Sequence, residues 1–76
     1  MKREVKRYRL NVDFEIVCVT KYIGDSKLYS ISVEMVSLPF MYTVERVDGI
    51  SEPSKANALF KELCQKYREG VKYYEG

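Results

Sequence analysis

The residue types that most often carry out chemistry are sparse in this chain of 76 residues. It contains no histidine, which excludes a Ser-His-Asp triad, a Cys-His nucleophile pair and histidine-based acid–base catalysis. Its two cysteines, Cys18 and Cys64, lie 46 positions apart and cannot complete a four-ligand zinc centre without histidine. The four glycines are isolated from one another, at Gly24, Gly49, Gly70 and Gly76. The chain therefore has no glycine-rich phosphate loop.

Paired carboxylates are the remaining candidates for catalysis or metal binding. Asp13 and Glu15 are two residues apart, so a strand would place them on one face, with Glu34 or Glu45 opposite. We interpret them as solvated side chains in cross-strand salt links. The expected partners are Arg7, Arg9 and Arg46. A chain this short also leaves little volume for a substrate pocket, so we expect neither an enzyme nor a small-molecule substrate.

Basic residues are concentrated at the N-terminus, which suggests that this end of the chain makes a polar contact. The first nine residues carry a net charge of +4 and the other 67 carry −2, so residues 1–7 resemble a basic arm on a slightly acidic body. The alternative is that these charges are solvated and protect a strand end from unwanted pairing. The candidate interaction residues combine this arm with valines and tyrosines: Lys2, Arg3, Lys6, Arg7, Arg9, Val17, Val19, Tyr73 and Tyr74.

Tyrosine is abundant, at seven of 76 residues, and tryptophan is absent. Five tyrosines fall on the apolar faces of expected elements: Tyr8, Tyr22, Tyr29, Tyr42 and Tyr67. We expect them in the core or at its rim. The alternative is that some of them join Tyr73 and Tyr74 in a surface that recognises a protein or single-stranded nucleic acid. A net charge of only +2 disfavours nucleic acid.

The element expected to position these residues is the stretch 8–22. Its alternate residues are mostly apolar: Tyr8, Leu10, Val12, Phe14, Ile16, Cys18, Thr20 and Tyr22. This alternation predicts a strand with one apolar face. Because no glycine or proline marks a turn at 11–13, we expect one coiled or bent strand rather than a tight hairpin. From Val17 onward the second face is also apolar, so this half is either central in the sheet or covered by a partner.

Two further strands follow a turn at residues 24–26. Alternation predicts one strand over about residues 27–37 and another over about residues 40–47. In the last strand we expect one face to hold Phe40, Tyr42 and Val44, and the other to hold Thr43 and Glu45. Short connections between the strands favour an antiparallel meander.

An amphipathic helix is predicted after a turn at residues 48–49. Ser51 is the expected N-cap, Pro53 suits the first turn, and Gly70 is a plausible C-terminal stop. The apolar residues between them form a single stripe: Ala56, Leu59, Phe60, Leu63, Cys64 and Tyr67. This stripe must be covered by the apolar face of the sheet. Residues 71–76 are expected to form a tail or a short edge strand.

Three short motifs precede the helix in order: Tyr8-x-Leu10, Tyr29-Ser30-Ile31-Ser32-Val33 and Val47-x-x-Ile50-Ser51. With these motifs the chain resembles, over most of its length, an uncharacterised family of small bacterial domains of unknown function. The resemblance implies several strands followed by one amphipathic helix. It implies no activity, because none is known for the family.

The cellular setting is inferred from the cysteines and from the hydropathy. Both cysteines fall on apolar faces, so we expect buried, reduced thiols, with a Cys18–Cys64 bridge as the alternative. No apolar run approaches the ~20 residues that span a bilayer. The basic N-terminus is not followed by the apolar segment of a signal peptide. We therefore expect a cytoplasmic protein without a membrane partner.

These patterns predict a single α+β domain over residues 1–76. We expect a twisted antiparallel sheet of three or four strands, in the order β-β-β-α, with the C-terminal helix packed on one face. The expected function is non-catalytic protein binding, either as a homodimer through residues 8–22 or by docking on a larger protein, as a phage or mobile-element modulator of a host protein would. The alternative is nucleic-acid binding by the basic N-terminal arm. No cofactor and no metal are expected.

Overall fold

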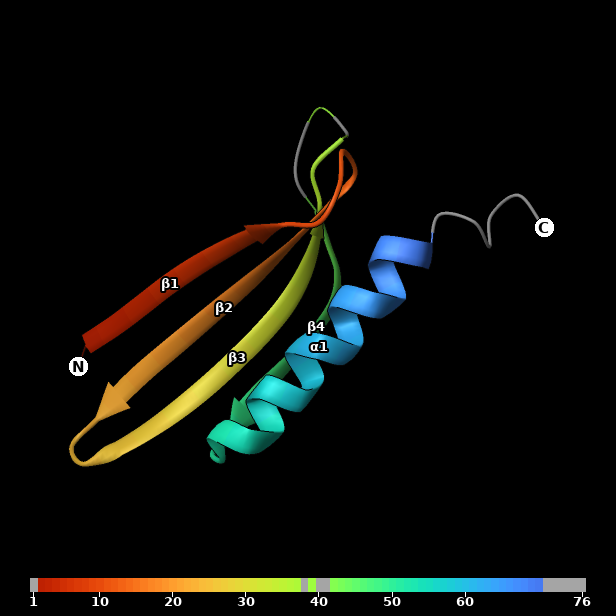
Figure 1. Ribbon diagram of the computed structural model, residues 1–76. Coiled ribbons are helices and arrows are strands. Elements are labelled where there is room, and N and C mark those ends of the chain that lie inside the picture. Colours follow the sequence, from red (N-terminus) through yellow and green to blue (C-terminus); the bar gives the residue numbers. More distant parts are fainter. Residues whose placement is uncertain (1, 38, 40–41, 71–76) are drawn as a thin grey trace.

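The computed structural model of the chain describes residues 2–37, 39 and 42–70. Its elements are β1 (Lys2–Arg9), β2 (Phe14–Ile23), β3 (Ser26–Met35), β4 (Tyr42–Ile50) and α1 (Pro53–Gly70). The strands form one antiparallel sheet in the order β1-β2-β3-β4, so β1 and β4 are its edges. The helix lies along one face of the twisted sheet (Figure 1). The predicted α+β fold is confirmed, and the sheet has four strands.

The prediction of one continuous strand over residues 8–22 is wrong, because this stretch contains a hairpin between β1 and β2. The side-chain Oδ1 of Asn11 accepts hydrogen bonds from the backbone N–H groups of Asp13 and Phe14, both at 2.9 Å. Asparagine thus stabilises the turn that we expected glycine or proline to mark. Paired residues of β1 and β2 are both even or both odd in number, so the alternation passes through the loop in phase.

Two glycines adopt a left-handed backbone conformation. Gly24, with φ of 59°, begins the predicted turn and is followed by Asp25, which completes a two-residue connection between β2 and β3. Gly49, with φ of 70°, was expected in a turn but lies within β4. There Asp48 and Gly49 together stand opposite Ser30. The expected turn is therefore a β-bulge.

A second bulge in β4 changes which side chains face the helix. The register shifts next to the Val33–Glu45 pair, which leaves Val44 as the extra residue. Val44 packs against the core, and the Glu45 carboxylate accepts a hydrogen bond from the Tyr67 hydroxyl on α1. The predicted placement of Val44 and Glu45 on opposite faces is wrong, because a bulge interrupts strict alternation.

The helix begins at Pro53, whose missing N–H group suits the first helical position. The carbonyl oxygen of Glu52 accepts the N–H of Ala56 at 3.1 Å. The N-cap residue is therefore Glu52 rather than Ser51, one position later than predicted. The helix ends at Gly70, as expected.

The core lies between α1 and the sheet. Its buried residues are Phe14, Ile16, Ile31, Val33, Ala56, Leu63 and Tyr67. All six residues of the predicted helical stripe are buried or pack against this cluster. The helix packs on β2, β3 and β4, while β1 extends beyond it and is reached through the contact of Tyr8 with Phe60, at 4.9 Å between ring centroids. The helix therefore leaves most of β1 uncovered (Figure 1).

Candidate functional site

The face of the sheet opposite α1 has no cover among the described residues, and we call it the uncovered face. Tyr8 contacts the helix, so the even-numbered residues of β1 share the helix side, and the odd-numbered residues point the other way. The register with β2 and β3 extends this face across the sheet. Its members include Arg3, Val5, Arg7, Arg9, Glu15, Val17, Val19, Lys21, Ser30, Ser32, Glu34, Thr43 and Arg46.

The structure brings five of the nine predicted interaction residues together on the uncovered face. These are Arg3, Arg7, Arg9, Val17 and Val19. Lys2 and Lys6 point to the helix side of β1, where Lys2 Nζ lies 5.7 Å from the centre of the Tyr22 ring. Tyr73 and Tyr74 lie outside the described residues.

The edge strand β1 is the most exposed regular element of the sheet. All eight of its residues are exposed, and its one strand neighbour in the described sheet is β2. The backbone groups along its outer side are therefore available to pair with another extended segment. The residues expected to form a basic arm belong to this strand.

Several cations of the uncovered face already have partners. Arg7 forms a salt bridge with Glu15 at 3.3 Å, which confirms a cross-strand salt link for this carboxylate. The Arg9 guanidinium donates to the carbonyl oxygens of Asn11 and Val12 in the hairpin loop, at 2.8 and 3.3 Å. These two arginines support the local structure of β1 and its turn.

Two other cations stand opposite each other, and the charge of one of them, Lys21, helps to lower the pKa of Asp48. Arg3 on β1 is directly paired with Lys21 on β2, and neither forms a salt bridge with any residue that the structure describes. Like charges in this arrangement destabilise a sheet. The opposed pair therefore marks a candidate site for an anion.

Arg3 and Lys21 lie at a hollow of about 180 Å³ in the uncovered face. Its lining residues are Arg3, Val19, Lys21, Ser30, Ser32 and Arg46. Beside it, Arg46 Nε is 3.0 Å from a carboxylate oxygen of Asp48. The hydrogen bond from Arg46, followed by one from Ser30, lowers the pKa of Asp48. We call this site the basic hollow, and its hydroxyl and cationic groups are suited to an anion.

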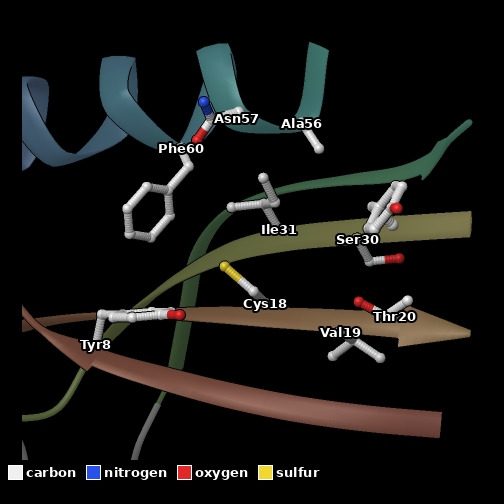
Figure 2. Close-up of a pocket in the computed structure, with 10 residues that line it drawn as sticks. Tyr8, Cys18, Val19, Thr20, Ser30, Ile31, Ala56, Asn57 and Phe60 are labelled. Carbon is white, nitrogen blue, oxygen red and sulfur yellow. The ribbon is translucent and has the colours of Figure 1, made fainter. Parts of the chain in front are cut away.

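A second cavity, of about 280 Å³, lies between the sheet and the N-terminal half of α1. Figure 2 shows Phe60 reaching down from the helix towards Tyr8, with Ile31 and Cys18 on the strands between them. Burial, and then the nearby Cys64, raise the pKa of the Cys18 thiol, so it is protonated at neutral pH and is a weak nucleophile. The lining of this helix-side cavity is mainly apolar, with Thr20, Ser30 and Asn57 as polar members.

Both cysteines are free, as expected, but they are half-buried rather than buried. Among the described residues no group of three or more histidine, cysteine or acidic side chains is arranged to hold a metal ion. The bridge that the sequence left open is not formed.

Glu15, Glu34 and Glu45 are held in structural contacts, whereas Asp13 lies in the hairpin loop and not on a strand face beside Glu15 as predicted. Glu34, rather than Glu45, stands opposite Glu15 on the uncovered face. Glu34 accepts a hydrogen bond from the Thr43 hydroxyl at 2.9 Å, and Glu15 is bound by Arg7. Glu45 lies on the helix side, where the Tyr67 hydroxyl, and secondarily Lys66, lower its pKa.

The sequence analysis did not assign Lys21, Arg46, Ser30 or Ser32 to an interaction site. Alternation marked Ser30 and Ser32 as polar positions, but it put Lys21 on a face interpreted as apolar and Arg46 on the face of Tyr42 and Val44. The four residues come together only through the register, which depends on the hairpin at Asn11 and on the bulges in β4.

Within the described part of the chain, no helix has the length and apolar character needed to cross a membrane. Comparison with protein-family models, with curated proteins and with solved structures found no match.

Proposed function

We propose that this protein is a non-catalytic protein-binding module that accepts an extended acidic segment of a larger protein as a fifth strand beside β1. The observation that carries the proposal is β1 itself, an edge strand of eight exposed residues that the helix does not cover. Strand addition of this kind obtains its affinity from backbone hydrogen bonds and its specificity from alternate side chains.

The charge of β1 indicates the chemistry of the added strand. β1 has five basic residues and one acid, Glu4. Lys2 and Lys6 project on one side, and Arg3 and Arg7 on the other, so an added strand meets cations on both of its faces. Carboxylates in directly opposed positions stabilise such a pairing, whereas basic side chains oppose it.

The same charges disfavour self-association through β1. In one continuous sheet with both helices on the same side, two β1 strands can pair antiparallel in several registers. A register centred on Val5 places Arg3 opposite Arg7, although it also places Glu4 opposite Lys6, and one centred on Lys6 places Arg3 opposite Arg9 without a compensating pair. Neighbouring registers also oppose like charges, so docking on another protein is favoured over a homodimer.

Nucleic-acid binding is the second candidate, and the clustering of Arg3, Lys21 and Arg46 on one face favours it. However, the described strands carry their tyrosines on the helix side, as the Tyr8–Phe60 contact and the Tyr29–Thr20 pairing indicate. A surface for single-stranded nucleic acid usually adds aromatic side chains on which bases stack. The uncovered face has cations without such a platform.

A synthetic ten-residue peptide of alternating glutamate and threonine tests the proposed function. We expect its addition to shift the amide resonances of β1 and to slow hydrogen exchange along the outer side of that strand. The double variant K2E/K6E should weaken binding about tenfold, because two attractive charges become repulsive. Lys61→Glu, an exposed change on α1, is the matched control and should bind normally.

Three outcomes contradict the proposal. Unchanged β1 resonances at millimolar peptide would exclude strand addition. A dimer mass in light scattering at micromolar protein would favour self-association instead. Binding of a single-stranded oligonucleotide that weakens steeply with salt, and that is lost in R3E/K21E, would favour the second candidate.

A further inference from the structure

We propose that the basic hollow is a binding site for the phosphate group of a small phosphate monoester, held as a dianion. The site lies on the uncovered face, between β1 and β4, away from the outer side of β1 where the acidic strand is proposed to add. It shares Arg3 with the proposed strand-addition surface, whereas Lys21, Ser30, Ser32 and Arg46 belong to the hollow alone.

The strongest observation is the opposed pair of cations at the rim of the hollow. Arg3 and Lys21 are directly paired across β1 and β2, and the described residues provide no salt bridge to either. Elsewhere on the same two strands a cation has an acidic partner, since Arg7 forms a salt bridge with Glu15 at 3.3 Å. An anion between Arg3 and Lys21 converts a repulsive pair into two attractive contacts.

The floor and the far side of the hollow supply a neutral donor and a third cation. Ser30 and Ser32 are two residues apart on β3, so their hydroxyls lie on the same side about 7 Å apart along the strand. The Ser30 hydroxyl donates to Asp48, so the neutral donor proposed for the ligand is Ser32. Arg46 on β4 is paired with Ser32 on β3. Its Nε is engaged by Asp48, which leaves the terminal N–H groups of the guanidinium for a ligand.

The net charge of the site selects the class of anion. Arg3, Lys21 and Arg46 provide three positive charges and Asp48 removes one, so the site carries +2. A phosphate monoester carries about −1.5 to −2 near neutral pH and has three acceptor oxygens, whereas a carboxylate carries one charge and two oxygens. The volume of about 180 Å³ equals about six waters of liquid, which accommodates one phosphate group with ordered water.

The test uses the whole chain at pH 7.5 and constant ionic strength, with amide resonances as the readout. Inorganic phosphate and phenyl phosphate should each produce saturable shifts in Lys21, Ser30 and Ser32, with a Kd on the order of 1 mM. Sodium acetate at equal ionic strength should not. The variant K21Q/R46Q should weaken phosphate binding at least tenfold, and Ser32→Ala about threefold.

Lys61→Gln is the control, since it removes an exposed cation from the helix, away from the hollow. The proposal would be overturned by amide resonance shifts that are linear in phosphate concentration, that acetate reproduces, or that persist in K21Q/R46Q. An oligonucleotide that binds this face when neither phosphate probe does would also overturn it. The acidic peptide is absent from this titration, so a negative result leaves strand addition at β1 intact, and the reverse also holds.

Discussion

The two sides of the sheet achieve burial in different ways. On the side that α1 covers, Ile16 and Val33 are completely buried, whereas on the uncovered face Val5 is 47% exposed. Val17 also belongs to the uncovered face, yet it is only 8% exposed, because it lies on a central strand between Arg7 and Ser32. Neighbouring strands can thus bury one small side chain, but they cannot replace the helix. The helix side supplies stability, and the uncovered face is left with charges suited to recognition.

The largest effect that separates the two sides is expected from truncating an apolar side chain on each. Leu63 is 1% exposed under the sheet, so Leu63→Ala should lower the free energy of unfolding by about 3 kcal/mol. Val5→Ala on the uncovered face should cost less than about 1 kcal/mol. Urea unfolding followed by circular dichroism measures both changes. Equal losses would show that the uncovered face contributes to the core.

The hairpin loop should show the next largest effect, because Asn11 stabilises the turn between β1 and β2 and connects it to α1. Its Oδ1 accepts two backbone N–H groups in the turn, and its Nδ2 lies 3.4 Å from the carbonyl oxygen of Tyr67 on α1. We expect Asn11→Ala to lower the free energy of unfolding by about 1–2 kcal/mol.

Asn11→Asp retains the acceptor and should cost less than half as much as Asn11→Ala. Asn57→Ala, on the exposed surface of the helix, is the control and should change stability by less than about 0.5 kcal/mol. A loss at Asn57 equal to that at Asn11 would contradict a specific role for the turn.

This hairpin also shows how far the sequence could be read. Alternation correctly predicted which residues of 14–23 and 26–35 face the helix, and the apolar stripe located α1. It could not reveal that the first stretch folds back, because a four-residue loop keeps the alternation in phase. Gly49 was predicted to lie in a turn, but the left-handed backbone conformation that it adopts occurs in turns and in β-bulges alike.

The candidate site depends on the pairing of the strands, which the alternation of apolar and polar residues does not specify. The basic residues of β1 were identified from composition alone. Lys21 and Arg46 are far from them in sequence and join them only through the β1–β2 and β3–β4 registers. A local pattern fixes the face on which a side chain lies, whereas the strand pairing fixes its neighbours.

A smaller effect is expected from pH on the helix side. The hydrogen bond from Tyr67 to Glu45, with a lesser contribution from Lys66, lowers the pKa of Glu45 below its ordinary value of 4.5. A carboxylate whose pKa is lower in the folded state contributes stability above its unfolded pKa, and this contribution is lost as the pH falls through the folded pKa.

The wild-type protein should therefore lose more stability than Glu45→Gln between pH 5 and pH 3. The difference should be below about 1 kcal/mol, because the Glu45 side chain is 34% exposed and solvent screens it. Thermal unfolding at several pH values measures this difference. Parallel pH curves for the two proteins would contradict the assignment.

The smallest effect concerns the salt bridge between Arg7 and Glu15 on the uncovered face. Its Arg7 side chain is 56% exposed, so a double-mutant cycle of R7A and E15A should give a coupling energy of about 0.5 kcal/mol, decreasing as salt rises from 0.05 to 0.5 M. Arg7→Ala alone should cost more than this coupling energy, because it leaves Glu15 directly opposite Glu34. Glu34→Gln in the Arg7→Ala background should recover part of that loss. A coupling energy above about 2 kcal/mol, unaffected by salt, would mean that the uncovered face stabilises the fold as strongly as the helix side does. Its charges would then be structural, and the contrast between the two sides would fail.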